Sequence, residues 1–241
     1  MSVYQTILAN IAQQKKMIVV LLDPDKCVGV VREQVLKSFG TVTPDFIFIG
    51  GSKTSNSIDE LLQSLRLIDV PKVLFPGDAS QFTPKADALL FLSLISGRNA
   101  DYLIGQHVNS ALKIKESTIE VIPTAYVLID GGNETAVKKI SNTIPLSSDD
   151  ITGCISTVVA GELLGLKMTY LEAGSGAKNP VPASMIEAVR KEISHPLIVG
   201  GGIKSVEELQ MAFNSGADLV VIGNFFETHP EKIVDFIHSI Y

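Results

Sequence analysis

Apolar residues recur along this chain in short uninterrupted runs, separated by longer segments in which apolar positions have helical spacing. An unbroken apolar run is typical of a parallel strand covered on both faces, and a 3.6-residue spacing is typical of an amphipathic helix. Such alternating units predict an α/β fold, a (β/α)8 TIM barrel, with an open doubly wound sheet as the alternative. The expected strands are residues 17–22, 46–49, 72–75, 88–92, 124–129, 168–171, 197–199 and 219–222.

The connection between the third and fourth expected strands breaks this pattern. Pro76 and Pro84 both lie in this short connection. Proline lacks the amide hydrogen that a helix interior needs and clashes with the preceding turn. We therefore expect a modified barrel in which helix 3 is replaced by a non-helical segment.

A second unusual segment is the predicted helix 151–164, which is almost entirely apolar or small. Ser148 is its expected N-cap, with Asp149 and Asp150 favourable in the first turn. A helix without a polar face is expected either to be deeply buried or to lie in a subunit interface.

Length and composition narrow the class of protein. The 241 residues suit one barrel domain spanning residues 1–241, since such barrels take roughly 250 residues. The net charge of −6 argues against nucleic acid as a partner. The apolar runs are far shorter than the roughly 20 residues that span a bilayer, and two distant cysteines fit a reducing cytoplasm.

The ends of the first two expected strands carry residues suited to a hard cation. Asp23, Asp25 and Lys26 follow the first strand, and Ser52 and Lys53 follow the second. Mg²⁺ takes one or two protein oxygens and leaves its other positions to water and phosphate. Asp23 is favoured over Asp25 because it is closer to the strand end. A polar turn with Asp23 as a cap, or an ordinary turn around Ser52, is the alternative.

The later strands end in residues suited to proton transfer and phosphate binding. Tyr170 and Glu172 are two residues apart and therefore share one face of their strand. A carboxylate that points into the barrel mouth is a natural general base, because desolvation raises its pKa. The turns at 174–176, 200–202 and 223–224 are rich in glycine, whose backbone amides can approach an anion. Arg98 is suited either to a diphosphate or to the surface, and the histidines show no metal-binding spacing.

Together these motifs resemble geranylgeranylglyceryl phosphate synthase and its bacterial relatives over nearly the whole chain. The Tyr-Leu-Glu-Ala-Gly-Ser-Gly stretch at 170–176 is the most specific of them. The others are Leu-Leu-Asp-Pro-Asp-Lys at 21–26, Ile-Gly-Gly-Ser at 49–52, Ser-Gly-Arg-Asn at 96–99, Val-Gly-Gly-Gly-Ile at 199–203 and Val-Ile-Gly-Asn at 221–224.

The resemblance implies an enzyme that transfers a prenyl group from geranylgeranyl diphosphate to the 3-hydroxyl of sn-glycerol 1-phosphate with Mg²⁺. It implies a barrel whose helix 3 is replaced, in agreement with the two prolines, and a homo-oligomer, either a dimer or a hexamer. A lipid substrate would be met at the membrane surface. Some bacterial relatives that use longer prenyl chains carry a lysine at the position of Leu21. With Leu21 and Asp-Pro-Asp this sequence resembles the archaeal-type group, which favours the geranylgeranyl donor.

Site residues follow from the resemblance position by position. Asp23 and Ser52 are expected to hold Mg²⁺ on the diphosphate, and Glu172, with Tyr170 beside it, to accept the hydroxyl proton. The residues expected to bind glycerol 1-phosphate are Tyr170, Leu171, Glu172, Ala173, Gly174, Ser175, Gly176, Gly201, Gly202, Gly223 and Asn224. The motifs assign no role to Asp25, Lys26, Lys53 or Arg98.

Two other functions are compatible with the glycine turns alone. One is another phosphate-binding barrel enzyme, such as a sugar-phosphate isomerase, which would not depend on Mg²⁺. The other is a non-catalytic barrel that binds phosphorylated ligands, which would not need Asp23 or Glu172.

Overall fold

The computed structural model describes residues 1–133 and 136–240; Tyr241, the last residue of the expected domain, lies outside the described residues. Its eight strands pair in parallel, each with its neighbour in sequence, and β1 pairs with β8 to close a barrel. This closure confirms the barrel prediction and excludes the open sheet. The strands are β1 Met17–Leu22, β2 Phe46–Ile49, β3 Lys72–Leu74, β4 Ala88–Leu94, β5 Glu120–Leu128, β6 Met168–Glu172, β7 Leu197–Gly200 and β8 Leu219–Ile222.

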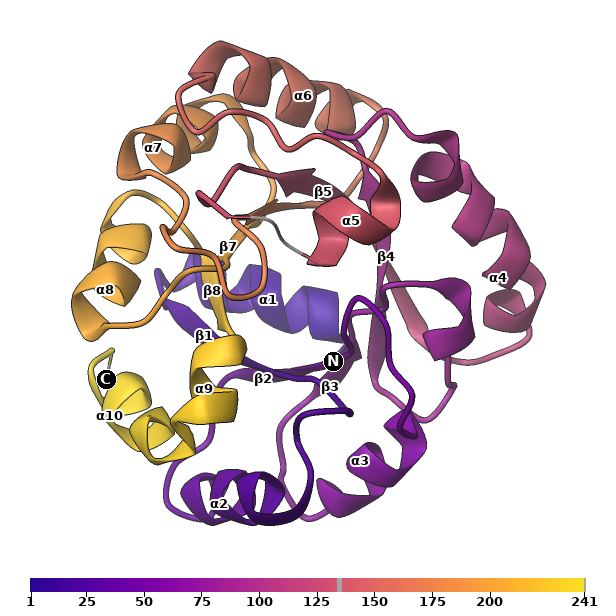
Figure 1. Cartoon of the computed structure of the whole chain (residues 1–241), viewed down its shortest axis with the longest axis vertical. Coiled ribbons are helices and arrows are strands. Elements are labelled where there is room, and N and C mark those ends of the chain that lie inside the picture. Colours follow the sequence, from indigo (N-terminus) through magenta and orange to yellow (C-terminus); the bar gives the residue numbers. More distant parts are fainter. Residues whose placement is uncertain (134–135, 241) are drawn as a thin grey trace.

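Helices surround the strands, and α1 lies across one end of the barrel (Figure 1). Val3 and Ile7 of α1 pack with the side chains that point into the barrel, so this helix closes the end opposite the candidate site. The helices are α1 Val3–Ala12, α2 Gly29–Phe39, α3 Ile58–Ser64, α4 Gln106–Lys115, α5 Ala136–Ser141, α6 Ile151–Leu163, α7 Ala183–Glu192, α8 Val206–Asn214, α9 Asn224–Thr228 and α10 Ile233–His238, with the shorter turns η1 Ala79–Gln81, η2 Asp101–Gly105 and η3 Pro230–Lys232.

Alternation along each strand divides the core into two layers. Met17 and Val19 point into the barrel, whereas Ile18 and Val20 pack against the surrounding helices. Both sets are buried, which is why the strands appear in the sequence as unbroken apolar runs. The same alternation decides which residues at a strand end can reach the barrel mouth.

The connection between β3 and β4 contains only the short turn η1, as the two prolines predicted. Gln81 fastens this connection over the end of β2, because its amide donates to the carbonyl of Gly51 at 2.8 Å and accepts from the amide of Gly77 at 3.1 Å. A side chain on Gly77 would collide with the backbone of Gly51 and Ser52. Loss of a helix here brings the loop close to the barrel mouth.

The N-cap prediction for α6 was wrong by two residues. Asp150 is the cap: its carboxylate accepts from the amide of Gly153 at 2.8 Å, because a turn at Ser147 delays the start of the helix. One face of α6 is buried through residues such as Cys154 and Val158, whereas Leu163 and Leu164 are exposed in the single chain.

Replacing Asp150 with alanine is expected to lower the melting temperature by roughly 2–4 °C, because loss of an N-cap costs about 1 kcal/mol. Thermal unfolding followed by circular dichroism measures this shift. Asp149→Ala is the matched control and should change the melting temperature much less. Equal shifts for the two variants would contradict the assignment of the cap.

Candidate active site

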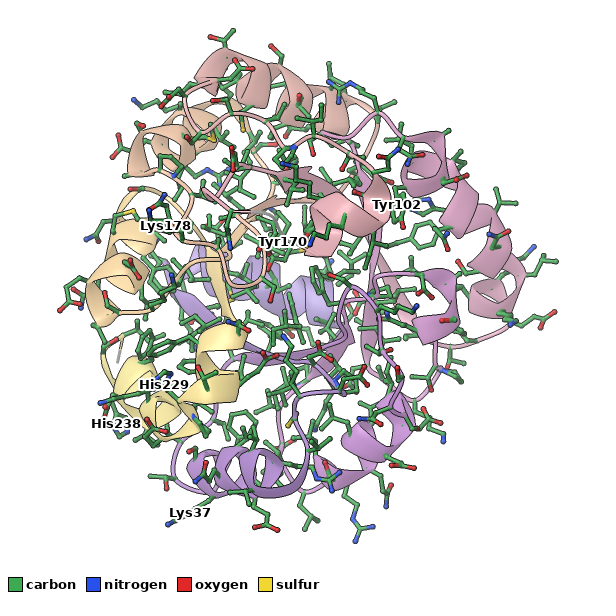
Figure 2. The ribbon with its side chains drawn as sticks, in the orientation of Figure 1. Lys37, Tyr102, Tyr170, Lys178, His229 and His238 are labelled. Atoms are coloured by element: carbon green, nitrogen blue, oxygen red, sulfur yellow. The ribbon has the colours of Figure 1, made fainter. Side chains whose placement is uncertain are left out.

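A cavity of about 530 Å³ opens at the carboxyl ends of the strands, large enough for a small phosphorylated ligand. Tyr170 lies near the middle of the ring of elements (Figure 2). We call this the mouth cavity. Predicted site residues that line it are Asp23, Ser52, Tyr170, Glu172, Ser175, Gly176, Gly201, Gly202, Gly223 and Asn224.

Three predicted residues, Leu171, Ala173 and Gly174, are not among those that line the mouth cavity. Leu171 and Ala173 belong to the core layer between strands and helices, as alternation from Tyr170 requires. The amide of Gly174 is already used, since it donates to Glu172 Oε1 at 2.6 Å. Gly174 thus supports the carboxylate, and the ligand-binding role of all three residues stays a prediction.

Glu172 is a buried carboxylate at the end of β6, with 5% of its surface exposed. Burial raises the pKa of Glu172 to about 7, against the lowering effects of the neighbouring Tyr170 hydroxyl and the Gly174 amide. A carboxylate with such a pKa can take up a proton near neutral pH, which is the property that a general base needs.

Tyr170 lies directly below this carboxylate, on the same face of β6 and fully buried. Its ring meets Phe75 and Tyr126 with centroid distances of 5.4 Å in both cases. The Tyr170 hydroxyl influences the pKa of Glu172 but forms no standard hydrogen bond within the described part of the chain. This buried hydroxyl is shielded from solvent, and its nearness to Glu172 stabilises the charged form of the carboxylate.

Gly201 has to be glycine if Glu172 is to keep its position. Its φ is +80°, and a Cβ there would collide with Glu172 Oε1 and the backbone amides of Ala173 and Gly174. The close approach of β7 to β6 is what confines the carboxylate. The glycine turn after β7 therefore lines the mouth cavity and also holds the Glu172 carboxylate in place.

Gly201→Ala is expected to lower turnover at least tenfold and to destabilise the fold by about 1–3 kcal/mol, because the alanine methyl displaces the Glu172 carboxylate. The measurements are kcat and the free energy of unfolding. Gly165→Ala is the matched control, since Gly165 has φ +86° but has open space around its missing Cβ. The same kcat in both variants would show that the collision does not matter.

Asp23 and Ser52 form an oxygen-rich corner of the mouth cavity. Parallel pairing of β1 with β2 places Leu22 beside Ile49, so the residues that follow both strands meet. The Asp23 carboxylate lies against the backbone of Gly51, and its Oδ1 accepts from the amide of Asp25 at 2.9 Å. Burial raises the pKa of Asp23.

The donor set in this corner fits Mg²⁺ bound mainly through a substrate. The described residues contain no cluster of three or more His, Cys, Asp or Glu side chains with metal-site geometry. One carboxylate and one hydroxyl are hard oxygen donors, and Mg²⁺ commonly takes its remaining ligands from phosphate and water. The corner thus suits a metal that arrives with a diphosphate.

The residues without a predicted role separate into two groups. Asp25 and Arg98 are structural: Asp25 accepts from the amides of Ser55 and Asn56, and Arg98 donates to the Ile95 carbonyl and, at 3.4 Å, to Thr157 of α6. Neither lines the mouth cavity. Lys26 and Lys53 do line it and add positive charge where an anion would bind.

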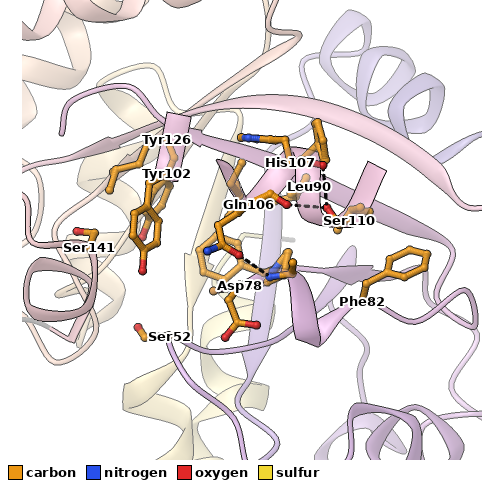
Figure 3. A pocket seen from close by; sticks show the side chains of 18 of the residues that line it. Ser52, Asp78, Phe82, Leu90, Tyr102, Gln106, His107, Ser110, Tyr126 and Ser141 are labelled. Carbon is orange, nitrogen blue, oxygen red and sulfur yellow. Dashed lines mark hydrogen bonds between the residues drawn. The ribbon is translucent and has the colours of Figure 1, made fainter. Parts of the chain in front are cut away.

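A second, narrower cavity of about 110 Å³ lies beside the mouth cavity, under the connection between β3 and β4 (Figure 3). We call it the side groove. Its walls are mostly apolar and come from β4, the η1 loop and α4, including Phe82, Leu90, His107 and Ser110. Had a helix occupied the β3–β4 connection, it would have covered this space.

The two cavities meet at shared residues. Gly51, Ser52, Phe75, Tyr126 and Ile140 line both of them. A ligand with a charged head and an apolar tail can therefore place its head beside Asp23 and Ser52 and its tail in the side groove. The sequence motifs did not name the groove residues, although the two prolines at 76 and 84 and the apolar strand predicted at 88–92 lie in this region.

Comparison with known proteins agrees with this geometry. A model described as the PcrB family matches residues 9–240. The chain belongs to the PcrB family. The geranylgeranylglyceryl phosphate synthase of Flavobacterium johnsoniae is 46% identical over 228 residues, 94% of each chain. That of Korarchaeum cryptofilum is 33% identical over 229 residues, 94% of this chain and 92% of the relative.

One solved structure with a similar fold contains a bound ligand. The crystal structure of (S)-3-O-geranylgeranylglyceryl phosphate synthase from Thermoplasma acidophilum, in complex with its substrate sn-glycerol 1-phosphate, superposes with a TM-score of 0.91. It is 29% identical, and the match covers 100% of this chain and 98% of the other. In the Thermoplasma acidophilum enzyme, this fold therefore binds a small phosphorylated alcohol.

Proposed function

We propose that this protein joins geranylgeranyl diphosphate to the 3-hydroxyl of sn-glycerol 1-phosphate and releases diphosphate. The observation that carries the proposal is the pair of connected cavities, one lined by charged side chains and a buried carboxylate and the other mostly by apolar side chains. Relatives that carry this enzyme name over nearly the whole chain support the same reaction.

Glycerol phosphate is proposed to bind on the side of the mouth cavity formed by the ends of β6, β7 and β8. Backbone groups at Gly176, Gly202 and Gly223 lie in this part of the lining and leave room for phosphate oxygens. The glycerol end then points toward Glu172 and Tyr170. Bound in this way, the 3-hydroxyl lies near the buried Glu172 carboxylate, whose pKa is about 7.

The prenyl diphosphate is proposed to bind across the junction of the two cavities. Asp23 and Ser52 would hold the metal on the diphosphate, and the apolar chain would enter the side groove past Phe75 and Tyr126. Bound Mg²⁺ would neutralise the diphosphate and make it a better leaving group.

Bond formation then depends on position and proton transfer. As the C1–oxygen bond of the diphosphate breaks, the glycerol 3-oxygen bonds to C1 and its proton passes to Glu172. Glu172 is held by the Gly174 amide and confined by Gly201, so its carboxylate is pre-oriented. Ordering two substrates in this geometry supplies much of the expected rate enhancement.

The test is an assay of the purified protein with radiolabelled sn-glycerol 1-phosphate, prenyl diphosphates of several lengths, and either Mg²⁺ or EDTA. Organic-soluble label that requires both Mg²⁺ and a prenyl diphosphate is the expected result, with the geranylgeranyl donor best. Glycerol phosphate binding without any extractable product would overturn the proposal and favour an isomerase or a non-catalytic binding protein.

Three further expectations remain part of the proposal. Both cysteines are buried free thiols, which supports a cytoplasmic enzyme. The exposed Leu163 and Leu164 at the end of α6 support a homo-oligomer, as does the low charge content of 19%. Within the described residues no helix is long and apolar enough to cross a membrane. We expect transient contact with a membrane surface during delivery of the prenyl donor.

A further inference from the structure

Lys26 occupies an unusual position between the two charged regions of the mouth cavity. Its Nζ lies 2.9 Å from Glu227 Oε2 and 3.8 Å from Asp23 Oδ2. The Glu227 side chain, on α9, is only 8% exposed although it lines a cavity built for anions. A buried carboxylate in such a place needs a cationic partner, and Lys26 is that partner.

The same ammonium group reaches a predicted phosphate-binding residue. Lys26 Nζ donates to Asn224 Oδ1 at 3.5 Å. An asparagine side chain has an acceptor end and a donor end, and Lys26 engages the acceptor end. The donor end, Nδ2, is the atom nearest to the open side of Gly176, at 3.7 Å from where a Cβ would be.

This orientation is the one that an anion requires. Phosphate oxygens accept hydrogen bonds, so they need the Nδ2 end of the amide to face them. If the amide turned over, Oδ1 would face the phosphate and repel it. Glu227 holds the Lys26 ammonium against Asn224, and the tertiary contact between the β1 loop and α9 thereby sets the direction of one side chain.

We infer that Lys26, held by Glu227, is a positioning residue that fixes the Asn224 amide with its donor end toward the phosphate of the acceptor substrate. The inference rests on the proposed function, because it assumes that glycerol phosphate binds beside Gly176 and Asn224. Lys26 acts through Asn224 and does not take part in the bond-forming step.

The test is isothermal titration of sn-glycerol 1-phosphate into the intact protein in EDTA, without prenyl donor. Lys26→Met and Asn224→Ala should each raise Kd about tenfold, the effect of losing one hydrogen bond to a charged group. The double variant should bind about as weakly as Asn224→Ala alone, since Lys26 has nothing left to orient. Lys26→Arg, which can contact both partners, should recover most of the affinity.

A control variant and a kinetic measurement separate this role from simple loss of charge. Lys178→Met removes a positive charge from the loop after β6, close to the glycine turn but outside the lining of the mouth cavity, and should change Kd less than about threefold. In turnover assays, Lys26→Met should raise KM for glycerol phosphate about tenfold, with kcat at saturation within about threefold of the parent.

Additive losses in the double variant, or an equal loss in Lys178→Met, would overturn the inference while leaving the proposed function intact. A parent protein that binds no glycerol phosphate would remove both.

Discussion

Replacing Glu172 by glutamine is expected to lower turnover at least about 100-fold while leaving the Kd for sn-glycerol 1-phosphate nearly unchanged. Glutamine keeps the shape of the side chain and can still accept the 2.6 Å hydrogen bond from the Gly174 amide. It cannot take up the hydroxyl proton. Steady-state kinetics for kcat and titration calorimetry for Kd measure the two effects separately.

The pH dependence provides an independent check on Glu172. Burial raises its pKa to about 7, so the carboxylate is protonated below that pH and cannot act as a base. Turnover of the parent should rise with pH up to about 7 and then level off, whereas the Glu172→Gln variant should lack this limb. Parent-like turnover in the variant would remove Glu172 from the proton transfer.

The same raised pKa has a consequence for stability. Because the folded protein holds a proton on Glu172 that the unfolded chain releases above its ordinary value of 4.5, folding stability falls as pH rises from about 4.5 to about 7. Glu172→Gln removes this penalty. The variant should therefore melt at a higher temperature than the parent at pH 8 and at a similar temperature at pH 4.5.

Replacing Asp23 by asparagine is expected to raise the Mg²⁺ concentration needed for half-maximal activity at least tenfold. Loss of even an outer-shell partner costs roughly 10–100-fold in metal affinity, and Asp23 is proposed as a direct ligand. Asparagine can still accept the 2.9 Å hydrogen bond from the Asp25 amide, so the loop should keep its shape. Mg²⁺ titrations of activity and of binding of a non-reactive prenyl diphosphate analogue measure the loss.

Asp25→Asn is the matched control for Asp23, since it lies two residues further along the same loop. Asp25 holds the amides of Ser55 and Asn56 and does not line the mouth cavity, so its Mg²⁺ titration curve should follow the parent. Identical curves for Asp23→Asn and the parent would rule out Asp23 as a metal ligand. The melting temperatures of both variants show whether the loop has changed.

The predicted bounds of a strand were accurate where all of its residues are largely buried. β1, β2 and β8 have the predicted bounds because every residue in them is largely shielded from water, so the apolar run and the strand coincide. β5 begins at Glu120, before the predicted start at 124. Its first residues are paired with Ala88 and Leu89 of β4, and pairing between distant segments leaves no local signal.

Only part of the candidate site could be predicted from the sequence. Parallel strands bring their carboxyl ends to one edge, so Asp23, Ser52 and Glu172 were expected to meet, and all three line one cavity. Glu227 belongs to none of the sequence motifs, because a glutamate on a short helix resembles a surface residue. The structure shows that the Glu227 side chain is buried and that it pairs with Lys26, which lies 201 positions earlier in the chain.

The sequence by itself determined the barrel, the loss of the helix between β3 and β4 and the residues at the strand ends, because apolar runs, helical spacing, proline and glycine act over a few residues. The tertiary structure alone decided two other features, the side groove under the η1 loop and the Lys26–Glu227–Asn224 contact, and it set the extent of the pKa rise of Glu172, whose direction the sequence predicted. Each depends on how closely segments far apart in the chain approach one another. Such distances set desolvation and hydrogen bonding, and they exist only once the barrel has closed.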